Sequence, residues 1–205
     1  MKFTKIRTVV PGDELKEKCS YSLGLYKEDN KIKSYVYGTL CRVQNHLFVI
    51  SKTSRYFPYI DDIVIGRVIY SCADYYKLDL DTYIGILPVL SFTNASKRNK
   101  PDIKKDDWLL CRIIESGAEP ILSCVGEGFG KLDGYVFKIK VWMCQMLYVD
   151  DFLYKIGKKY NFKCCVGING YICITGEAIT VRDVYTEIIK CFKYCFLVIK
   201  NIHVQ

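Results

Sequence analysis

The sequence predicts an α+β protein in three small units: a β-rich N-terminal unit (residues 1–57), a central β-barrel (58–116) and a C-terminal unit that mixes strands and helices (117–205). Two observations support this organisation. Up to about residue 114, short apolar runs alternate with Gly, Pro, Asn and Asp, which is typical of short strands and hairpins. Beyond residue 118, two segments carry apolar residues at helical spacing instead.

The composition is that of a chain that can bury a core, since 50% of the 205 residues are hydrophobic and 25% are charged. A formal net charge of +8 favours an anionic partner, because clustered Lys and Arg bind phosphate chains by releasing counterions. The N-terminus lacks the apolar core of a signal peptide, and no segment approaches the roughly 20 apolar residues of a membrane span. We therefore expect a soluble protein that stays inside the cell and contacts no membrane.

Neither catalysis nor a cofactor is indicated. Aspartate pairs such as Asp61-Asp62 and Asp106-Asp107 lie where turns are expected, and adjacent carboxylates on a strand point to opposite faces. The glycine-rich run 126–130 lacks the Lys-Ser or Lys-Thr of a phosphate loop, so it is interpreted as a flexible turn. Eleven cysteines without a CxxC pair are expected to be reduced, buried thiols rather than zinc ligands. We expect no catalytic residue, cofactor or metal.

In the N-terminal unit, apolar runs at residues 23–26, 35–40 and 47–50 predict short strands. The charged stretch 27–33 between two of them is predicted to be a hairpin loop or an exposed edge. In the central unit, residues 62–70, 75–80, 83–90 and 107–114 predict strands rich in Ile, Val, Leu and Tyr. Four or five short strands without a helix favour a small barrel of the OB-fold class.

The loop at residues 91–101 of this barrel is long, polar and basic, and it carries the predicted nucleic-acid site. Its Lys97, Arg98, Asn99 and Lys100 supply charge and hydrogen-bond donors for phosphates. Tyr75 or Tyr76 at the start of a strand would stack a base, although only one of the two can face outward, and we assign Tyr76. The alternative is that both tyrosines pack inward and the loop is merely solvated.

In the C-terminal unit, residues 135–141 predict a strand and 142–160 a helix, with a lysine stripe of Lys155, Lys158 and Lys159 expected to face solvent. Residues 162–166 and 171–174 predict a tight hairpin around an Asn-Gly pair. Residues 177–199 predict a long amphipathic helix whose core-facing residues are Val184, Ile188, Phe192, Cys195, Phe196 and Ile199.

Several segments together resemble one family, the ribosomal RNA-processing protein 40 family of S1-and-KH cap subunits of the eukaryotic RNA exosome. The resemblance spans nearly the whole chain and rests on Val10-Pro11-Gly12-Asp13-Glu14-Leu15, Arg55-Tyr56-Phe57-Pro58, Asp62-Ile63-Val64-Ile65-Gly66-Arg67-Val68, Ala95-Ser96-Lys97-Arg98-Asn99-Lys100-Pro101 and Gly167-Ile168-Asn169-Gly170. It implies an N-terminal β domain, a central S1-type OB-fold barrel and a C-terminal KH-like domain. It also implies a hetero-oligomer with a six-subunit ring, a non-catalytic role in guiding RNA to degradation and rRNA processing, and a location in nucleus, nucleolus and cytoplasm.

The GxNG segment formed by Gly167, Ile168, Asn169 and Gly170 has a different expected role. A usual KH domain holds RNA with a GxxG loop between two helices, whereas this segment lies between two β runs. The resemblance implies a buried structural turn at a domain interface. Three readings stay open for the whole chain: an RNA-binding cap subunit or its sister S1/KH subunit, a purely structural brace, and an independent hydrolase.

Overall fold

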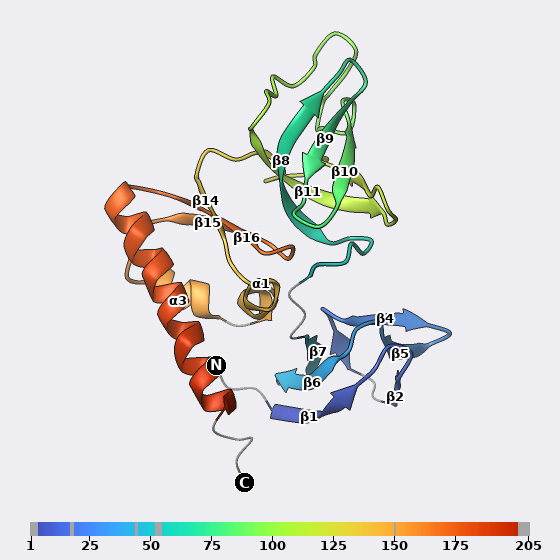
Figure 1. Ribbon diagram of the computed structural model, residues 1–205, viewed down its shortest axis with the longest axis vertical. Helices are drawn as coiled ribbons and strands as arrows, with labels where there is room; N and C mark the ends of the chain where they lie inside the picture. The colour runs from blue at the N-terminus through green and yellow to red at the C-terminus, as the bar shows by residue number, and fades with distance from the viewer. Residues whose placement is uncertain (1–3, 17–18, 44, 52–54, 150, 201–205) are drawn as a thin grey trace.

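The computed structural model describes residues 4–16, 19–43, 45–51, 55–149 and 151–200, the side chains of 149 and 193–200 excepted. Its elements form three units (Figure 1). The barrel lies at one end of the molecule, the N-terminal sheets lie at the other, and the C-terminal unit lies beside both, with α3 along its outer side. Within the described residues, no helix is long and apolar enough to cross a membrane.

The N-terminal unit consists of two small sheets. One has the strand order β1-β6-β7-β3 and the other β2-β5-β4. The expected charged loop 27–33 is itself a two-stranded hairpin, because Asp29 and Asn30 adopt positive φ values of 49° and 61° and so reverse the chain in two residues. The strands are β1 (Thr4–Val9), β2 (Glu14–Leu15), β3 (Ser20–Tyr21), β4 (Leu25–Glu28), β5 (Lys31–Ser34), β6 (Gly38–Val43) and β7 (His46–Ile50).

The central unit is a closed barrel, which confirms the predicted fold class. Its strands are β8 (Ile63–Ser71), β9 (Tyr75–Asp79), β10 (Ile84–Pro88), β11 (Trp108–Glu115), β12 (Ile121–Ser123) and β13 (Gly130–Lys131). The sheet order is β12-β10-β9-β8-β11-β13, and an additional β12–β11 pairing closes it. The barrel sheet thus continues past residue 116, where the sequence placed the domain end. Ser116, Gly117 and Pro120 therefore belong to a turn between β11 and β12 inside the barrel, not to a linker.

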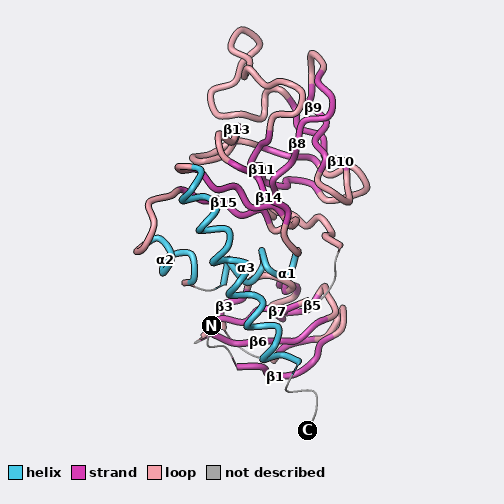
Figure 2. The backbone as a smooth tube through the Cα atoms, turned by 60° about the vertical axis from the view of Figure 1, so that its left-hand side comes forward, coloured by secondary structure: helices cyan, strands magenta, loops and turns pink. Residues whose placement is uncertain are grey.

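The C-terminal unit packs helices against a three-stranded sheet ordered β14-β16-β15 (Figure 2). Its elements are β14 (Tyr135–Lys138), α1 (Val141–Val149), α2 (Phe152–Gly157), β15 (Lys163–Gly167), β16 (Tyr171–Thr175) and α3 (Ala178–Lys200). The predicted hairpin and last helix are confirmed, with Val184, Ile188 and Phe192 buried. The side chains of Cys195, Phe196 and Ile199 lie outside the described residues.

The single helix predicted over residues 142–160 is wrong, because two short helices, α1 and α2, occupy that stretch. The α1 sequence is apolar on almost every side, which is typical of a helix that is buried all round. Its Cys144 and Leu147 share a core cluster with Cys41 and Phe48 of the N-terminal sheet and with Ile172 of β16. Helix α1 therefore joins the first and last units of the chain.

The cysteines act as packing residues. Cys41, Cys111, Cys124, Cys144 and Cys173 are buried thiols. Burial raises the pKa of Cys144 to about 12, so this thiol stays protonated at neutral pH.

The aspartates expected in turns lie there as well, since Asp61, Asp81 and Asp106 have positive φ values of 68°, 82° and 72°.

Candidate nucleic-acid interface

The basic loop between β10 and β11 presents two cations at its tip. Ser96 and Asn99 exchange backbone hydrogen bonds in both directions, at 3.0 and 3.1 Å, and the Ser96 hydroxyl also accepts from the Asn99 N–H at 3.1 Å. These contacts fold residues 96–99 into a tight turn, with Lys97 and Arg98 at its apex. Both side chains are exposed. Within the described residues, neither forms an ion pair or hydrogen bond, so their charge is available to a ligand.

The two ends of the loop are anchored to the barrel. The Phe92 backbone bridges to Cys124, and the Asn99 side-chain amide donates to the Asn94 carbonyl at 3.3 Å. On the other side, the Lys100 ammonium donates to the carbonyl oxygen of Ala73 at 2.9 Å. Lys100 thereby holds the basic loop against the β8–β9 connection. The loop tip is a fixed projection from the barrel end.

The prediction that Tyr76 stacks a base is wrong, because Tyr76 is buried and Tyr75 is the tyrosine that faces solvent. Tyr76 is only 5% exposed, its ring packs edge-on against Phe92 with centroids 6.2 Å apart, and its hydroxyl donates to the Pro101 carbonyl at 3.3 Å. Residues of the 91–101 loop therefore cover Tyr76. Strand alternation instead turns Tyr75 outward, where it is half-buried.

Tyr70 is an aromatic residue that sequence reasoning missed. It is 51% exposed, and its ring lies 6.3 Å from that of Tyr75. Both flank the β8–β9 connection whose Ala73 carbonyl receives Lys100. The sequence did contain a signal for Tyr70: it lies near the end of a predicted strand, just before a short hairpin connection. The barrel end therefore offers two rings beside a cationic loop.

A groove of about 740 Å³ lies on the other side of the loop. Phe92, Ile103 and Phe129 supply its apolar lining, and the glycine-rich run 126–130 forms one rim. The Thr93 hydroxyl accepts from the Gly126 N–H at 3.0 Å, which joins the glycine-rich run to the basic loop. The Arg112 guanidinium lies 5.2 Å from the centre of the Phe129 ring. The glycine-rich run 126–130, which was predicted to be a flexible turn, therefore forms a wall of this groove.

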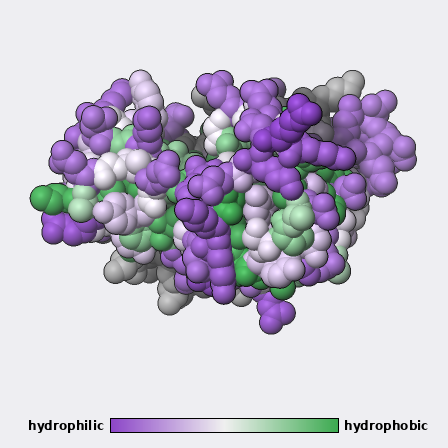
Figure 3. Space-filling model, turned by 90° about the horizontal axis from the view of Figure 1, so that it is seen from above, coloured by the Kyte–Doolittle hydropathy of each residue, from purple (hydrophilic) through white to green (hydrophobic). Residues whose placement is uncertain are grey.

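Acidic groups near the groove are partly neutralised. Asp107 pairs with Lys131 at 2.9 Å, and the Lys104 backbone N–H together with the Lys131 ammonium holds the pKa of Asp107 below its usual value. Asp102 lies 3.9 Å from the Lys104 ammonium. Seen from the barrel end, hydrophilic residues dominate the surface, with apolar residues showing between them (Figure 3). Because these carboxylates lie near the groove, a phosphate is expected to bind at the loop tip, beside Lys97 and Arg98.

The Gly167–Gly170 segment lies at the opposite end of the barrel and is buried. Asn169 is 1% exposed. Its amide nitrogen donates to the carbonyls of Ile65 at 2.8 Å and Leu80 at 3.3 Å, while its oxygen accepts from the Ile65 N–H at 3.0 Å. A Cβ on Gly167 would lie 2.6 Å from the Ile65 nitrogen. The segment is a joint between the barrel and the C-terminal unit, and its backbone is closed to a phosphate.

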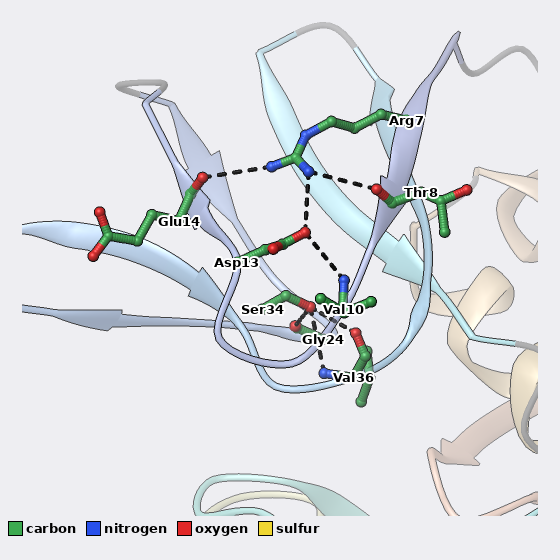
Figure 4. Close-up of polar contacts among 8 residues, drawn as sticks. All are labelled: Arg7, Thr8, Val10, Asp13, Glu14, Gly24, Ser34 and Val36. Carbon is green, nitrogen blue, oxygen red and sulfur yellow. Dashed lines mark hydrogen bonds and ion pairs between the residues drawn. The ribbon is translucent and has the colours of Figure 1, made fainter.

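The Val10–Leu15 motif is also a structural turn (Figure 4). The Asp13 carboxylate accepts from the Val10 N–H at 3.1 Å and from the Arg7 guanidinium at 3.0 Å. Gly12 at the apex has a φ of 91°, which favours glycine. In the same view, the Ser34 hydroxyl donates to the Val36 carbonyl at 2.7 Å. These contacts fix the shape of the N-terminal unit.

No metal centre is evident in the part of the chain that the structure describes, because no three His, Cys, Asp or Glu side chains there converge on one point. The geometry therefore brings together Lys97, Arg98, Asn99 and Lys100 on one loop, and leaves Tyr76 and the Gly167–Gly170 segment buried.

Comparison with known proteins identifies the central and C-terminal units. The family model for the S1 domain of exosome complex component RRP40 matches residues 56–135, and a KH domain model matches residues 134–180. These matches confirm the S1-type barrel and the KH-like unit. A solved structure described as an exosome complex RNA-binding protein has a TM-score of 0.52 at 22% identity, covering 60% of this chain and 76% of that one, which shows a shared fold.

Relatives align over most of the chain. The exosome complex component rrp40 of Dictyostelium discoideum is 30% identical over 187 residues, which cover 83% of this chain and 79% of the relative. The exosome complex component rrp40 of Schizosaccharomyces pombe is 26% identical, covering 78% and 75%. The exosome complex component Rrp4 of the archaeon Methanosphaera stadtmanae is 31% identical, covering 82% and 79%.

Proposed function

The chain belongs to the Rrp40 family of exosome complex components, and from that premise we propose that it is a non-catalytic cap subunit that guides RNA toward degradation. In this proposal it binds other exosome subunits, stabilises their ring and serves rRNA processing and RNA turnover in nucleus, nucleolus and cytoplasm. One observation carries the proposal. Lys97 and Arg98 project unpaired from a braced turn at the free end of an S1-type barrel.

The chemistry of this end suits single-stranded RNA. Cations that follow a phosphate backbone, together with aromatic faces that stack bases, bind single strands without sequence preference. Lys97 and Arg98 supply the cations, Asn99 a nearby amide, and Tyr70 and Tyr75 the rings. Lys100 positions the loop through Ala73. The expected specificity is for RNA backbone and stacking, with little preference for sequence.

The test replaces Lys97, Arg98 and Lys100 with alanine in the assembled complex. Because each lost phosphate contact lowers the salt dependence by about 0.7 on a single strand, loss of the Lys97 and Arg98 contacts should lower the log–log salt slope by about 1.4, and the affinity should fall roughly tenfold. Binding of a fluorescent oligouridylate at several salt concentrations measures both quantities. Unchanged affinity and slope would remove the loop from the RNA path.

A matched control removes the same number of exposed, unpaired lysines elsewhere. Lys5, Lys27 and Lys140 are exposed and form no ion pair within the described part of the chain. Their joint replacement by alanine lowers the net charge equally. If this control weakens RNA binding as much as the loop variant does, the effect belongs to overall charge and the loop assignment fails.

A structural brace is the second candidate function, favoured by the buried Asn169 joint. It predicts that the loop variant leaves RNA handling intact while the subunit stays in the complex.

The sister S1/KH subunit is a further alternative, favoured by the 31% identity to the archaeal Rrp4. Mass spectrometry of the proteins that co-purify with this chain tests the sister-subunit alternative, since a second, distinct Rrp40 in the complex would exclude the proposed identity.

A further inference from the structure

Helix α2 carries a second cationic surface, which the proposed function leaves unused. Tyr154, Lys155, Lys158 and Lys159 lie in and just after the helix, and all four are exposed. The opposite face packs into the core through Phe152, Leu153 and Ile156. Spacings of three and four residues place the exposed four on one side. We call these four residues the α2 surface.

Several cations elsewhere in the C-terminal unit form ion pairs. Lys138 pairs with Asp81, Arg182 with Asp183 and Lys190 with Glu187. Within the described residues, no carboxylate lies within ion-pair distance of Lys155, Lys158 or Lys159. Like charges three and four residues apart repel one another. The C-terminal end of this six-residue helix offsets part of the repulsion.

An aromatic ring lies among these charges. Tyr154 is 68% exposed, and the Lys158 ammonium lies 4.7 Å from the centre of its ring. A large ring held open to solvent beside three ammonium groups offers both a stacking face and phosphate contacts. An acidic protein segment would use the ammonium groups and leave the ring without a role. Single-stranded RNA uses both.

We propose that the α2 surface is a second RNA contact, which binds the phosphate backbone through Lys155, Lys158 and Lys159 and stacks one base on Tyr154. This inference rests on the proposed function for its ligand, but not on the basic loop. The surface lies on the KH-like unit, away from the barrel end that carries the loop (Figure 2). It also differs from the Gly167–Gly170 joint, which is buried.

The test measures binding of a long oligouridylate by the assembled complex that contains Lys155→Gln, Lys158→Gln and Lys159→Gln together. The salt slope should fall by about 2 and the affinity roughly tenfold. Tyr154→Ala should weaken binding about fivefold, whereas Tyr154→Phe, which keeps a stacking ring, should bind like the parent. The charge control is Lys5→Gln, Lys27→Gln and Lys140→Gln.

The same lysine variant is also measured in the loop-variant background, which separates the two claims. A further loss there supports the α2 surface even if the loop substitutions alone do nothing, in which case only the loop assignment fails. Three results would overturn the inference: affinity and slope equal to those of the parent, a loss no larger than that of the charge control, or release of the subunit from the complex on size exclusion. Release would show that the surface binds a protein.

Discussion

At the scale of single residues, Asn169 has the largest structural role. It satisfies the N–H and the carbonyl of Ile65 and the carbonyl of Leu80 from inside a core where it is 1% exposed. Beside it, the Ile168 N–H donates to the Ile63 carbonyl at 2.9 Å. A side-chain amide has two N–H donors and an acceptor oxygen, which match the two carbonyls and the one N–H that it meets here. The segment therefore fixes β15 and β16 against β8.

Replacing Asn169 with alanine should lower the free energy of unfolding by about 3 kcal/mol, because the buried backbone groups of Ile65 and Leu80 lose their partners. Urea denaturation of the purified chain measures this loss. The control is Asn161→Ala, since Asn161 is exposed and its replacement should change stability by less than about 0.5 kcal/mol. Equal effects of the two substitutions would contradict the assigned role of Asn169.

The two adjacent tyrosines show what a residue pattern can and cannot predict. Alternation along β9 correctly requires Tyr75 and Tyr76 to face opposite sides. It does not say which side is the interior, because both residues are Tyr and the pattern reads equally well in either register. The choice is made by tertiary contacts, namely Phe92 against the Tyr76 ring and Pro101 on its hydroxyl. Both contacts come from a loop that follows in the sequence.

At the scale of elements, residues 55–62 connect the N-terminal sheets to the barrel through a partly buried carboxyl group. The Tyr56 hydroxyl donates to the Asp62 carboxylate at 2.5 Å, and the Tyr59 N–H donates to the same oxygen at 3.0 Å. The Tyr59 ring stacks on Tyr35 with centroids 4.5 Å apart. Burial raises the pKa of Asp62 to about 7, against the effect of the two donors.

This connection should make stability depend on pH. The folded chain keeps a proton on Asp62 that the unfolded chain loses above its ordinary pKa of 3.8, so stability falls as pH rises through that value toward about 7. Asp62→Asn keeps an oxygen that accepts both hydrogen bonds and cannot ionise. It should be more stable than the parent by about 2 kcal/mol near pH 8 and nearly equal near pH 4.

Urea midpoints measured across that pH range check this expectation, with Asp61→Asn as the control because Asp61 is exposed and Asn also accepts its positive φ. An Asp62→Asn chain whose advantage does not grow with pH would contradict a partly buried, protonated carboxyl. The Asp61→Asn chain should still lose stability as pH rises, though by less than the parent, because the Asp61 charge contributes to the raised pKa of Asp62.

Among the elements, α1 shows why helix boundaries were hard to predict. The stretch 142–160 has apolar residues at helical spacing throughout, and periodicity alone does not reveal that its two halves face different surroundings. Cys144 and Leu147 of α1 lie between the N-terminal sheet and β16, whereas α2 buries only one face. The stretch divides into two helices because α1 is buried on two sides and α2 on one, a difference that the spacing of apolar residues does not reveal.

At the scale of the whole molecule, the C-terminal unit holds the other two together. Cys41 and Phe48 of the N-terminal unit share a cluster with α1, and Ile65 and Leu110 of the barrel share another with Tyr171 and Cys173. The three-unit order and the closed barrel were predictable because strand and helix periods change along the chain. The resemblance also implied that Gly167–Gly170 lies at an interface, but it did not give the partner residues, since these lie about 100 positions away, as in the bond from Asn169 to Ile65.

The arrangement separates a rigid joint at one end of the barrel from an open cationic loop at the other. Lys100 reaches Ala73 just before β9, whereas Asn169 reaches Leu80 just after it. An RNA strand guided by this subunit should therefore touch the loop end and leave the joint untouched.

Photo-crosslinking of a thiouridine-containing single strand to the assembled complex tests this separation most directly, with crosslinked peptides identified by mass spectrometry. We expect crosslinks at Tyr70, Tyr75 or the loop around Lys97 and Arg98, and none within the Gly167–Gly170 segment. Crosslinks in that segment, or none in the barrel of a complex that binds RNA, would contradict the account.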